Sequence, residues 1–117
     1  MKFEIVGNGV VYISCEELVI TDAQSALDLI ATVRYETQCE RIIVDKSAVA
    51  EDFFKLSTGL AGEVLQKFIN YHMKLAIVGD FSKYTSKPLK DFIYESNRGK
   101  HFFFVGTVQE ALERMSL

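Results

Sequence analysis

Two aspartates at the ends of apolar runs are the side chains best placed to do chemistry in this sequence. Asp45 ends the run at residues 41–45, and Asp80 follows the run at residues 75–79. If these runs are neighbouring parallel strands, both carboxylates lie at one edge of the sheet, where they could bind a cation or share a proton. The alternative is that they accept hydrogen bonds from the loop amides that follow. Since no third ligand or histidine stands at metal-ligand spacing, we expect no metal and no catalytic centre.

Ser57 could accept a phosphoryl group at the start of a predicted helix. A phosphate there would lie near the positive end of the helix dipole and would add a charge of roughly −2 to a partner surface. The alternative is that the hydroxyl of Ser57 or Thr58 caps the helix, which requires no partner. We expect the cap.

Four aromatic residues fall in predicted loops near the same edge, namely Phe53, Phe54, Phe81 and Tyr84. They could fold back into the core. They could instead form an exposed apolar patch that binds a protein partner, a lipid or a small ligand. Both alternatives are open at this point.

Further polar side chains accompany the aspartates. Ser47 and Ser82 each lie just after one of them, and Lys46, Lys83 and Lys87 could hold an anion, although no glycine-rich phosphate loop is present. We expect the following residues to bind a partner or ligand, the polar ones and Tyr84 within one cleft: Asp45, Ser47, Phe53, Phe54, Asp80, Phe81, Ser82 and Tyr84.

The elements that would position these residues follow from the apolar pattern. Short continuous apolar runs at residues 41–45, 75–79 and 101–105 are typical of strands buried on both faces of a parallel sheet. Residues 2–6 and 10–14 flank a Gly-Asn-Gly turn and predict a β-hairpin.

Helical patterns alternate with these strands. They cover residues 22–37, 61–72, 86–98 and 107–115, with a looser turn over 48–54. This alternation favours right-handed crossovers. We therefore predict an α/β fold with a mostly parallel five-stranded sheet, an N-terminal β-hairpin and four or five helices.

Composition limits the class of protein. A length of 117 residues with 49% hydrophobic content predicts a single domain over residues 1–117 with a packed core. Thirteen basic against sixteen acidic residues, a net charge of −3, argue against a nucleic-acid surface. No apolar run approaches the ~20 residues that span a bilayer, and the first residues do not resemble a secretory signal. We expect a cytoplasmic protein in which Cys15 and Cys39 are free thiols.

The stretch at residues 42–79 reads Ile-Ile-Val-Asp-Lys-Ser, then Leu-Ser-Thr-Gly-Leu, then a helix, then Lys-Leu-Ala-Ile-Val-Gly. It resembles the STAS superfamily, the SpoIIAA-like anti-sigma-factor antagonists. The resemblance implies a SpoIIAA-like fold, protein partners in bacterial regulation, and Ser57 at the position of the phosphorylated serine. Leu56 stands where the superfamily motif has an acid, and the loop is three residues longer.

The whole chain is also similar to a family of small bacterial proteins known only as a domain of unknown function. The similarity rests on Thr21-Asp22-Ala23-Gln24, Glu51-Asp52-Phe53-Phe54, Leu60-Ala61-Gly62-Glu63 and Gly79-Asp80-Phe81-Ser82. It implies no activity.

We therefore expect a regulatory module that acts through protein–protein contacts and needs no cofactor. The alternative is a carrier or sensor of a small apolar ligand or lipid, favoured by the loop aromatics and by a similarity of the later part of the chain to the SpoIIAA-like lipid-binding branch. The third alternative is an enzyme that uses Asp45 and Asp80.

Overall fold

A five-stranded sheet with strand order β1-β2-β3-β4-β5 forms the centre of the computed structural model, which describes residues 1–115. Strands β1 and β2 are antiparallel, and every later neighbouring pair is parallel. The predicted hairpin and mostly parallel sheet are therefore confirmed. The strands are β1 (Lys2–Gly7), β2 (Val10–Ser14), β3 (Arg41–Asp45), β4 (Lys74–Val78) and β5 (Phe102–Val105).

Four α-helices and three short 3₁₀ turns connect the strands. Helix α1 begins with a capping box in which the Asp22 carboxylate accepts from the Ser25 amide at 2.7 Å. Helix α3 begins at a Ser86 cap with Pro88 in its first turn. The helices are α1 (Ala23–Thr37), α2 (Leu60–Asn70), α3 (Lys87–Arg98) and α4 (Val108–Met115), and the 3₁₀ turns are η1 (Lys46–Ala48), η2 (Glu51–Phe54) and η3 (Leu56–Thr58).

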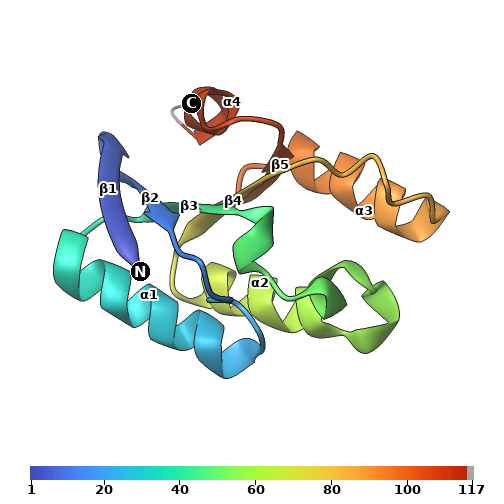
Figure 1. Ribbon diagram of the computed structural model, residues 1–117, viewed down its shortest axis with the longest axis horizontal. Helices are drawn as coiled ribbons and strands as arrows, with labels where there is room; N and C mark the ends of the chain where they lie inside the picture. Colours follow the sequence, from blue (N-terminus) through green and yellow to red (C-terminus); the bar gives the residue numbers. More distant parts are fainter. Residues whose placement is uncertain (116–117) are drawn as a thin grey trace.

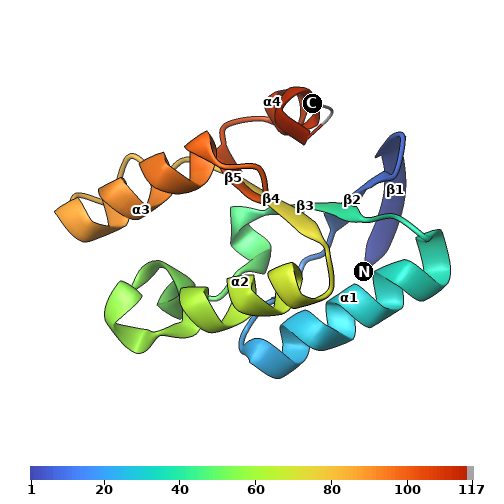
Figure 2. The same ribbon diagram turned by 180° about the vertical axis from the view of Figure 1, so that it is seen from behind.

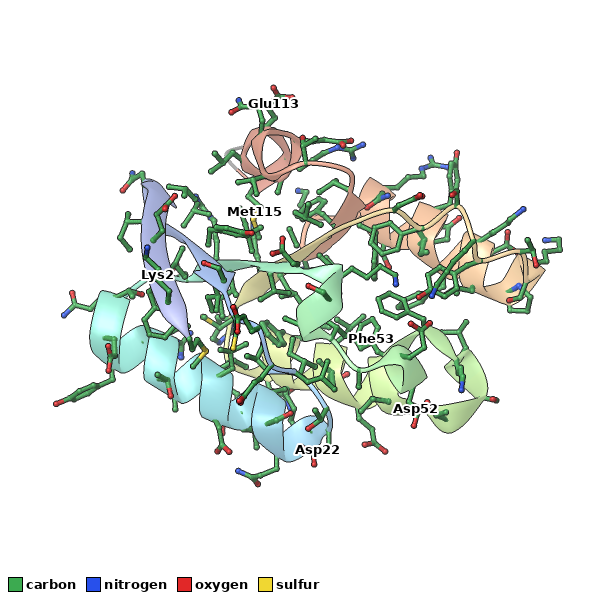
Figure 3. The ribbon with its side chains drawn as sticks, viewed as in Figure 1. Lys2, Asp22, Asp52, Phe53, Glu113 and Met115 are labelled. Carbon is green, nitrogen blue, oxygen red and sulfur yellow. The ribbon has the colours of Figure 1, made fainter. Side chains whose placement is uncertain are left out.

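The helices divide unequally between the two faces of the sheet (Figures 1 and 2). Helices α1 and α2 cover one face, and Leu89 of α3 joins the same, larger core beside Phe104 of β5. Helix α4 alone covers the opposite face with Ala111 and Met115. Figure 3 shows Met115 directed toward the sheet and Glu113 directed away from it.

Side-chain alternation assigns each strand residue to one face. On β3, Ile42 and Val44 belong to the larger core, whereas Ile43 packs against α4. This alternation also determines on which face of the sheet each predicted site residue lies. Within residues 1–115, no helix is long and apolar enough to cross a membrane, and Cys15 and Cys39 are both free.

Candidate functional site

Two loops leave the carboxyl ends of β3 and β4 and form the candidate site. The β3–α2 loop contains the three 3₁₀ turns, and Gly59 ends it with a φ of +77°, which turns the chain into α2 at no steric cost. The β4–α3 loop spans residues 79–86. We call the exposed side of these two loops the loop surface.

Aromatic side chains join the two loops from inside. The rings of Phe54 and Tyr84 stack with centroids 5.1 Å apart, and Phe53 packs edge-on against Phe54 at 5.1 Å. Phe81 reaches Phe54 at 5.9 Å and Phe104 of β5 at 5.6 Å. Each such pair contributes about 0.5–1.5 kcal/mol beyond burial of its area.

This packing decides between the two alternatives for the loop aromatics. Phe53 is 1% exposed and Phe54 is 4% exposed, so both belong to the core and not to a surface patch. Figure 3 shows Phe53 inside, between the sheet and α2, while Asp52 of the same 3₁₀ turn lies outside. Phe81 and Tyr84 are partly buried against the same core.

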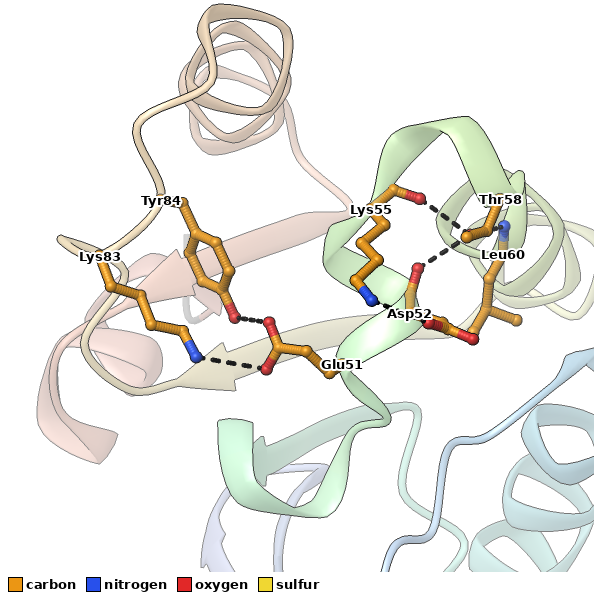
Figure 4. Close-up of polar contacts among 7 residues, drawn as sticks. All are labelled: Glu51, Asp52, Lys55, Thr58, Leu60, Lys83 and Tyr84. Carbon is orange, nitrogen blue, oxygen red and sulfur yellow. Dashed lines mark hydrogen bonds and ion pairs between the residues drawn. The ribbon is translucent and has the colours of Figure 1, made fainter.

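A polar clamp closes the two loops above the rings (Figure 4). The Tyr84 hydroxyl donates to Glu51 Oε2 at 2.6 Å, and Lys83 Nζ lies 3.4 Å from Glu51 Oε1. Lys46 Nζ lies 3.7 Å from the same oxygen, and it lies over the rings of Phe54 and Tyr84 at 5.3 and 5.1 Å. The carboxylate of Glu51 is thus shared by one hydroxyl and two ammonium groups.

The ionisation of the clamp follows from these contacts. The hydrogen bond from Tyr84, followed by the charges of Lys46 and Lys83, lowers the pKa of Glu51. Burial, followed by the hydrogen bond to Glu51, raises the pKa of Tyr84 above its ordinary value. At neutral pH the clamp therefore consists of a carboxylate and a neutral phenol.

The clamp also shows what lies beside the three lysines that were predicted to hold an anion at this edge. Lys46 and Lys83 face Glu51, an anion of the chain itself. Lys87 does not join them, because its Nζ pairs with Asp91 Oδ2 at 2.6 Å on α3. Glu51 is the residue that the sequence analysis did not single out as a site. Its signal in the sequence was its place in Glu51-Asp52-Phe53-Phe54, one of the segments on which the family similarity rests.

The stem of Lys46 reaches the clamp by crossing Gly79. A Cβ on Gly79 would lie 2.6 Å from Lys46 Cβ, closer than side chains approach. The Gly79 amide donates to Val105 O at 2.9 Å and so cannot move freely away. This close approach explains why glycine stands at the end of β4.

Thr58, and not Ser57, forms the structural hydrogen bonds of the loop (Figure 4). Thr58 Oγ1 lies 2.8 Å from both Asp52 O and Lys55 O, and it accepts from the Leu60 amide at 3.2 Å. The expected side-chain cap at Ser57 or Thr58 is not found: Gly59 is the N-cap of α2 and makes no side-chain cap bond, and Thr58 instead holds the turn before it. Ser57 is exposed, and its side chain forms none of the hydrogen bonds among residues 1–115.

Asp80, Ser82 and Ser47 lie on the loop surface and are exposed. The Asp80 carboxylate accepts from the Ser82 amide at 2.9 Å. Hydrogen bonds from the Ser82 hydroxyl and backbone lower the pKa of Asp80. This is the loop-amide role that the sequence analysis weighed as the alternative to a reactive carboxylate.

Asp45 does not join the other predicted site residues. Its side chain follows the parity of Ile43 and accepts from the Tyr12 hydroxyl at 2.7 Å, on the face that α4 covers. That hydrogen bond, followed by burial, raises the pKa of Tyr12 to about 12. Asp45 instead borders an open hollow of about 650 Å³ with Ser14 and Cys15. The sheet therefore separates Asp45 from the clamp, and the expectation of one cleft does not hold for this residue.

Metal-ligating residues do not gather in the part of the chain that the structure describes: no three His, Cys, Asp or Glu side chains there could hold an ion together. The arrangement at the loop surface is suited to contact with another molecule, because it offers a fixed backbone and exposed polar groups.

Comparison with known proteins supplies the family and the fold. The model of DUF4180, a domain of unknown function, matches residues 6–115. A crystal structure from Thermotoga maritima, of a protein proposed to be an anti-sigma factor antagonist, is similar with a TM-score of 0.52. The two chains are 17% identical over 99% of this chain and 94% of that chain, which establishes a shared SpoIIAA-like fold. No match is found among the curated proteins.

Proposed function

We propose that the chain, which belongs to the DUF4180 family of unknown function, is a cytoplasmic bacterial regulatory module. It acts through protein–protein contacts, as its anti-sigma-factor-antagonist fold suggests. The loop surface makes the contact. By analogy with the Thermotoga maritima protein, an anti-sigma factor is the class of partner to test first.

The proposal rests on the environment of the Ser57 hydroxyl. That hydroxyl is exposed and contributes no hydrogen bond to the fold, while Thr58 beside it forms the local structural contacts. A modification of Ser57 would therefore change the surface without unfolding the loop. The neighbouring ion pair, Lys55 Nζ to Asp52 Oδ1 at 3.6 Å, is exposed and can rearrange.

Phosphorylation of Ser57 is the regulation that we infer. The phosphate would add a charge of roughly −2 next to Lys55 and close to the amino end of α2, where the helix dipole favours an anion. The charges of the neighbouring Lys55–Asp52 pair cancel, so the phosphate would make the surface that a partner meets locally negative.

The core packing gives the apolar-ligand carrier no comparable support. The rings that could line an apolar site, Phe53 and Phe54, contact one another and Phe104 instead of surrounding a space. The enzyme alternative has none either, because the Asp45 carboxylate accepts from Tyr12 and the Asp80 carboxylate accepts from the Ser82 amide, and each therefore has a structural partner.

Affinity capture with charge-matched variants tests the proposal. Wild type, Ser57→Asp and Gln109→Glu are used as bait in lysate of the native host, and the captured protein is purified and titrated against each bait. Gln109 is exposed on α4, so its variant adds the same charge on the opposite face. We expect one partner that binds wild type and Gln109→Glu equally, and Ser57→Asp about tenfold more weakly.

Two results would contradict the proposal. One is a partner that binds all three baits with equal affinity, since the loop surface would then lie outside the contact. The other is native mass spectrometry that finds a small apolar molecule retained by the chain and no captured protein. Equal melting temperatures of the three baits exclude unfolding as the cause of any loss.

A further inference from the structure

A second hollow lies at the opposite end of the sheet from the loop surface, beside the amino ends of β4 and β5. Its volume is about 360 Å³, within the range of small-molecule sites. We call it the basic pocket. It is lined by Lys74 at the start of β4, residues 97–100 at the end of α3, Phe103 of β5 and Arg114 of α4.

Every charged residue in the lining of the basic pocket is basic. The lining contains Lys74, Arg98, Lys100 and Arg114 and no acidic residue, although the whole chain has a net charge of −3. The ion pairs found among residues 1–115 involve other lysines. Arg41, in register with Lys74 on the neighbouring strand, lies outside the lining, and its guanidinium donates to Asn8 O at 3.3 Å.

Two of these four cations, Arg98 and Arg114, lie at the carboxyl end of α3, where the negative end of the helix dipole favours positive charge. Arg114 Nη1 donates to Asn97 O at 2.9 Å in the last turn of α3, and Arg98 belongs to that turn. Lys74 lies on a strand and Lys100 lies beyond the helix. Neither lysine ammonium takes part in the side-chain hydrogen bonds or ion pairs of residues 1–115, where lysine donors are found only in the clamp, the 3₁₀ turns and α3. Both are therefore available to a ligand.

The walls of the basic pocket are held in place without a ligand. The Asn97 amide accepts from the Phe104 N–H at 2.7 Å and donates to Phe104 O at 3.1 Å, as a partner strand would on this edge strand. This double contact fastens the end of α3 to β5. Phe103 belongs to the smaller core and, at 4% exposed, adds a small apolar area to the lining. The pocket thus combines a backbone frame that Asn97 holds in place with lysine charges that no acidic side chain of residues 1–115 pairs.

We propose that the basic pocket binds a small organic anion, in which a phosphate or carboxylate group meets Lys74 and Lys100 and an apolar part rests on Phe103. Such a ligand combines the two features of the lining, and charge-assisted hydrogen bonds to ammonium and guanidinium groups are the strong ones. The site is separate from the loop surface and does not depend on the function proposed for it.

Amide chemical shifts of the ¹⁵N-labelled full chain test this site. Phenyl phosphate, benzoate, inorganic phosphate and a short polyglutamate peptide are titrated separately at about 150 mM NaCl, where exposed charges are screened. We expect phenyl phosphate or benzoate to shift saturably the amides of Lys74, residues 98–100 and Phe103, and to bind more tightly than inorganic phosphate. The two organic probes distinguish a phosphate from a carboxylate ligand.

Charge-matched variants give the control. The double variant Lys74→Gln, Lys100→Gln should weaken binding about tenfold, because two charged donors are lost. The variant Lys2→Gln, Lys90→Gln removes the same charge from exposed positions outside the pocket and should bind as wild type does.

Three results would overturn the proposal. The first is no saturable shift of pocket amides with either organic probe up to about 10 mM. The second is equal weakening in both double variants, which would show a general effect of charge. The third is a response to the polyglutamate peptide alone, which would assign this surface to an acidic protein.

Discussion

Replacing Tyr84 by Phe would remove one hydroxyl from the clamp and keep the ring that stacks on Phe54. That hydroxyl donates to Glu51 Oε2 at 2.6 Å. The matching change, Glu51→Gln, removes the charge at the other end of the bond and keeps the size of the side chain. We expect both variants to lower the free energy of unfolding, because each weakens a charge-assisted hydrogen bond between the loops.

The magnitude follows from how far Glu51 is shielded from water. A hydrogen bond to a charged group contributes about 1.5–3 kcal/mol when it is shielded. The Glu51 side chain is 49% exposed, so screening reduces this value, and the ion pairs with Lys46 and Lys83 add little. We expect Tyr84→Phe to cost about 1 kcal/mol and Glu51→Gln about 1–1.5 kcal/mol, with a coupling of about 1 kcal/mol in a double-mutant cycle.

Urea unfolding monitored by far-ultraviolet circular dichroism is the assay, since the chain contains no tryptophan. Tyr35→Phe is the matched control, because Tyr35 is 88% exposed on α1 and loses the same atom. Its free energy of unfolding should change by less than about 0.5 kcal/mol. The loop surface also depends on this clamp, so the same variants report on partner binding.

The pH dependence supplies a second readout. The pKa of Glu51 is lowered from its ordinary value of 4.5, so its contribution is present above pH 4.5 and is lost as pH falls through the lower, folded-state pKa. We expect the coupling between Tyr84 and Glu51 to shrink as the pH falls below 4.5. A coupling below about 0.3 kcal/mol at neutral pH, or one that is unchanged in acid, would refute this account of the clamp.

Three further changes test neighbouring parts of the structure by urea unfolding. Thr58→Ala should cost about 0.5–2 kcal/mol because it removes the hydroxyl that bonds the backbone of the turn before α2, whereas Ser57→Ala should stay within about 0.5 kcal/mol; the reverse order would contradict this assignment. Gly79→Ala should cost about 1–3 kcal/mol because its Cβ overlaps Lys46, and a smaller loss would mean that the stem moves aside freely. Asn97→Ala should cost about 1–3 kcal/mol, since it leaves two backbone groups of β5 unpaired, and amide exchange of Phe104 should accelerate; unchanged exchange would contradict the edge contact.

The sequence by itself determined the sheet and its order of elements. Continuous apolar runs of about five residues cannot be amphipathic, so they must be covered on both faces, and helical segments between them require parallel pairing. Ser86 lies three residues before the amide that it binds, and the predicted start of the first helix at residue 22 is within one residue of α1, although the cap is Asp22 with Ser25 and not Thr21 with Gln24; helix starts thus follow from local chemistry to about one residue. These properties depend on neighbours along the chain.

The tertiary structure decided which side chains of the carboxyl edge meet. Asp45 and Lys46 are consecutive, yet the pleat sends Asp45 to Tyr12 on the α4 face and Lys46 to Glu51 on the other. The partner of Tyr84 lies 33 positions away in the sequence, at the end of an irregular path through 3₁₀ turns that no periodicity describes. Only packing of the rings between the loops fixes that path. The basic pocket has the same origin, because its cations come from β4, α3, α4 and the turn after α3, and only the folded chain brings them together.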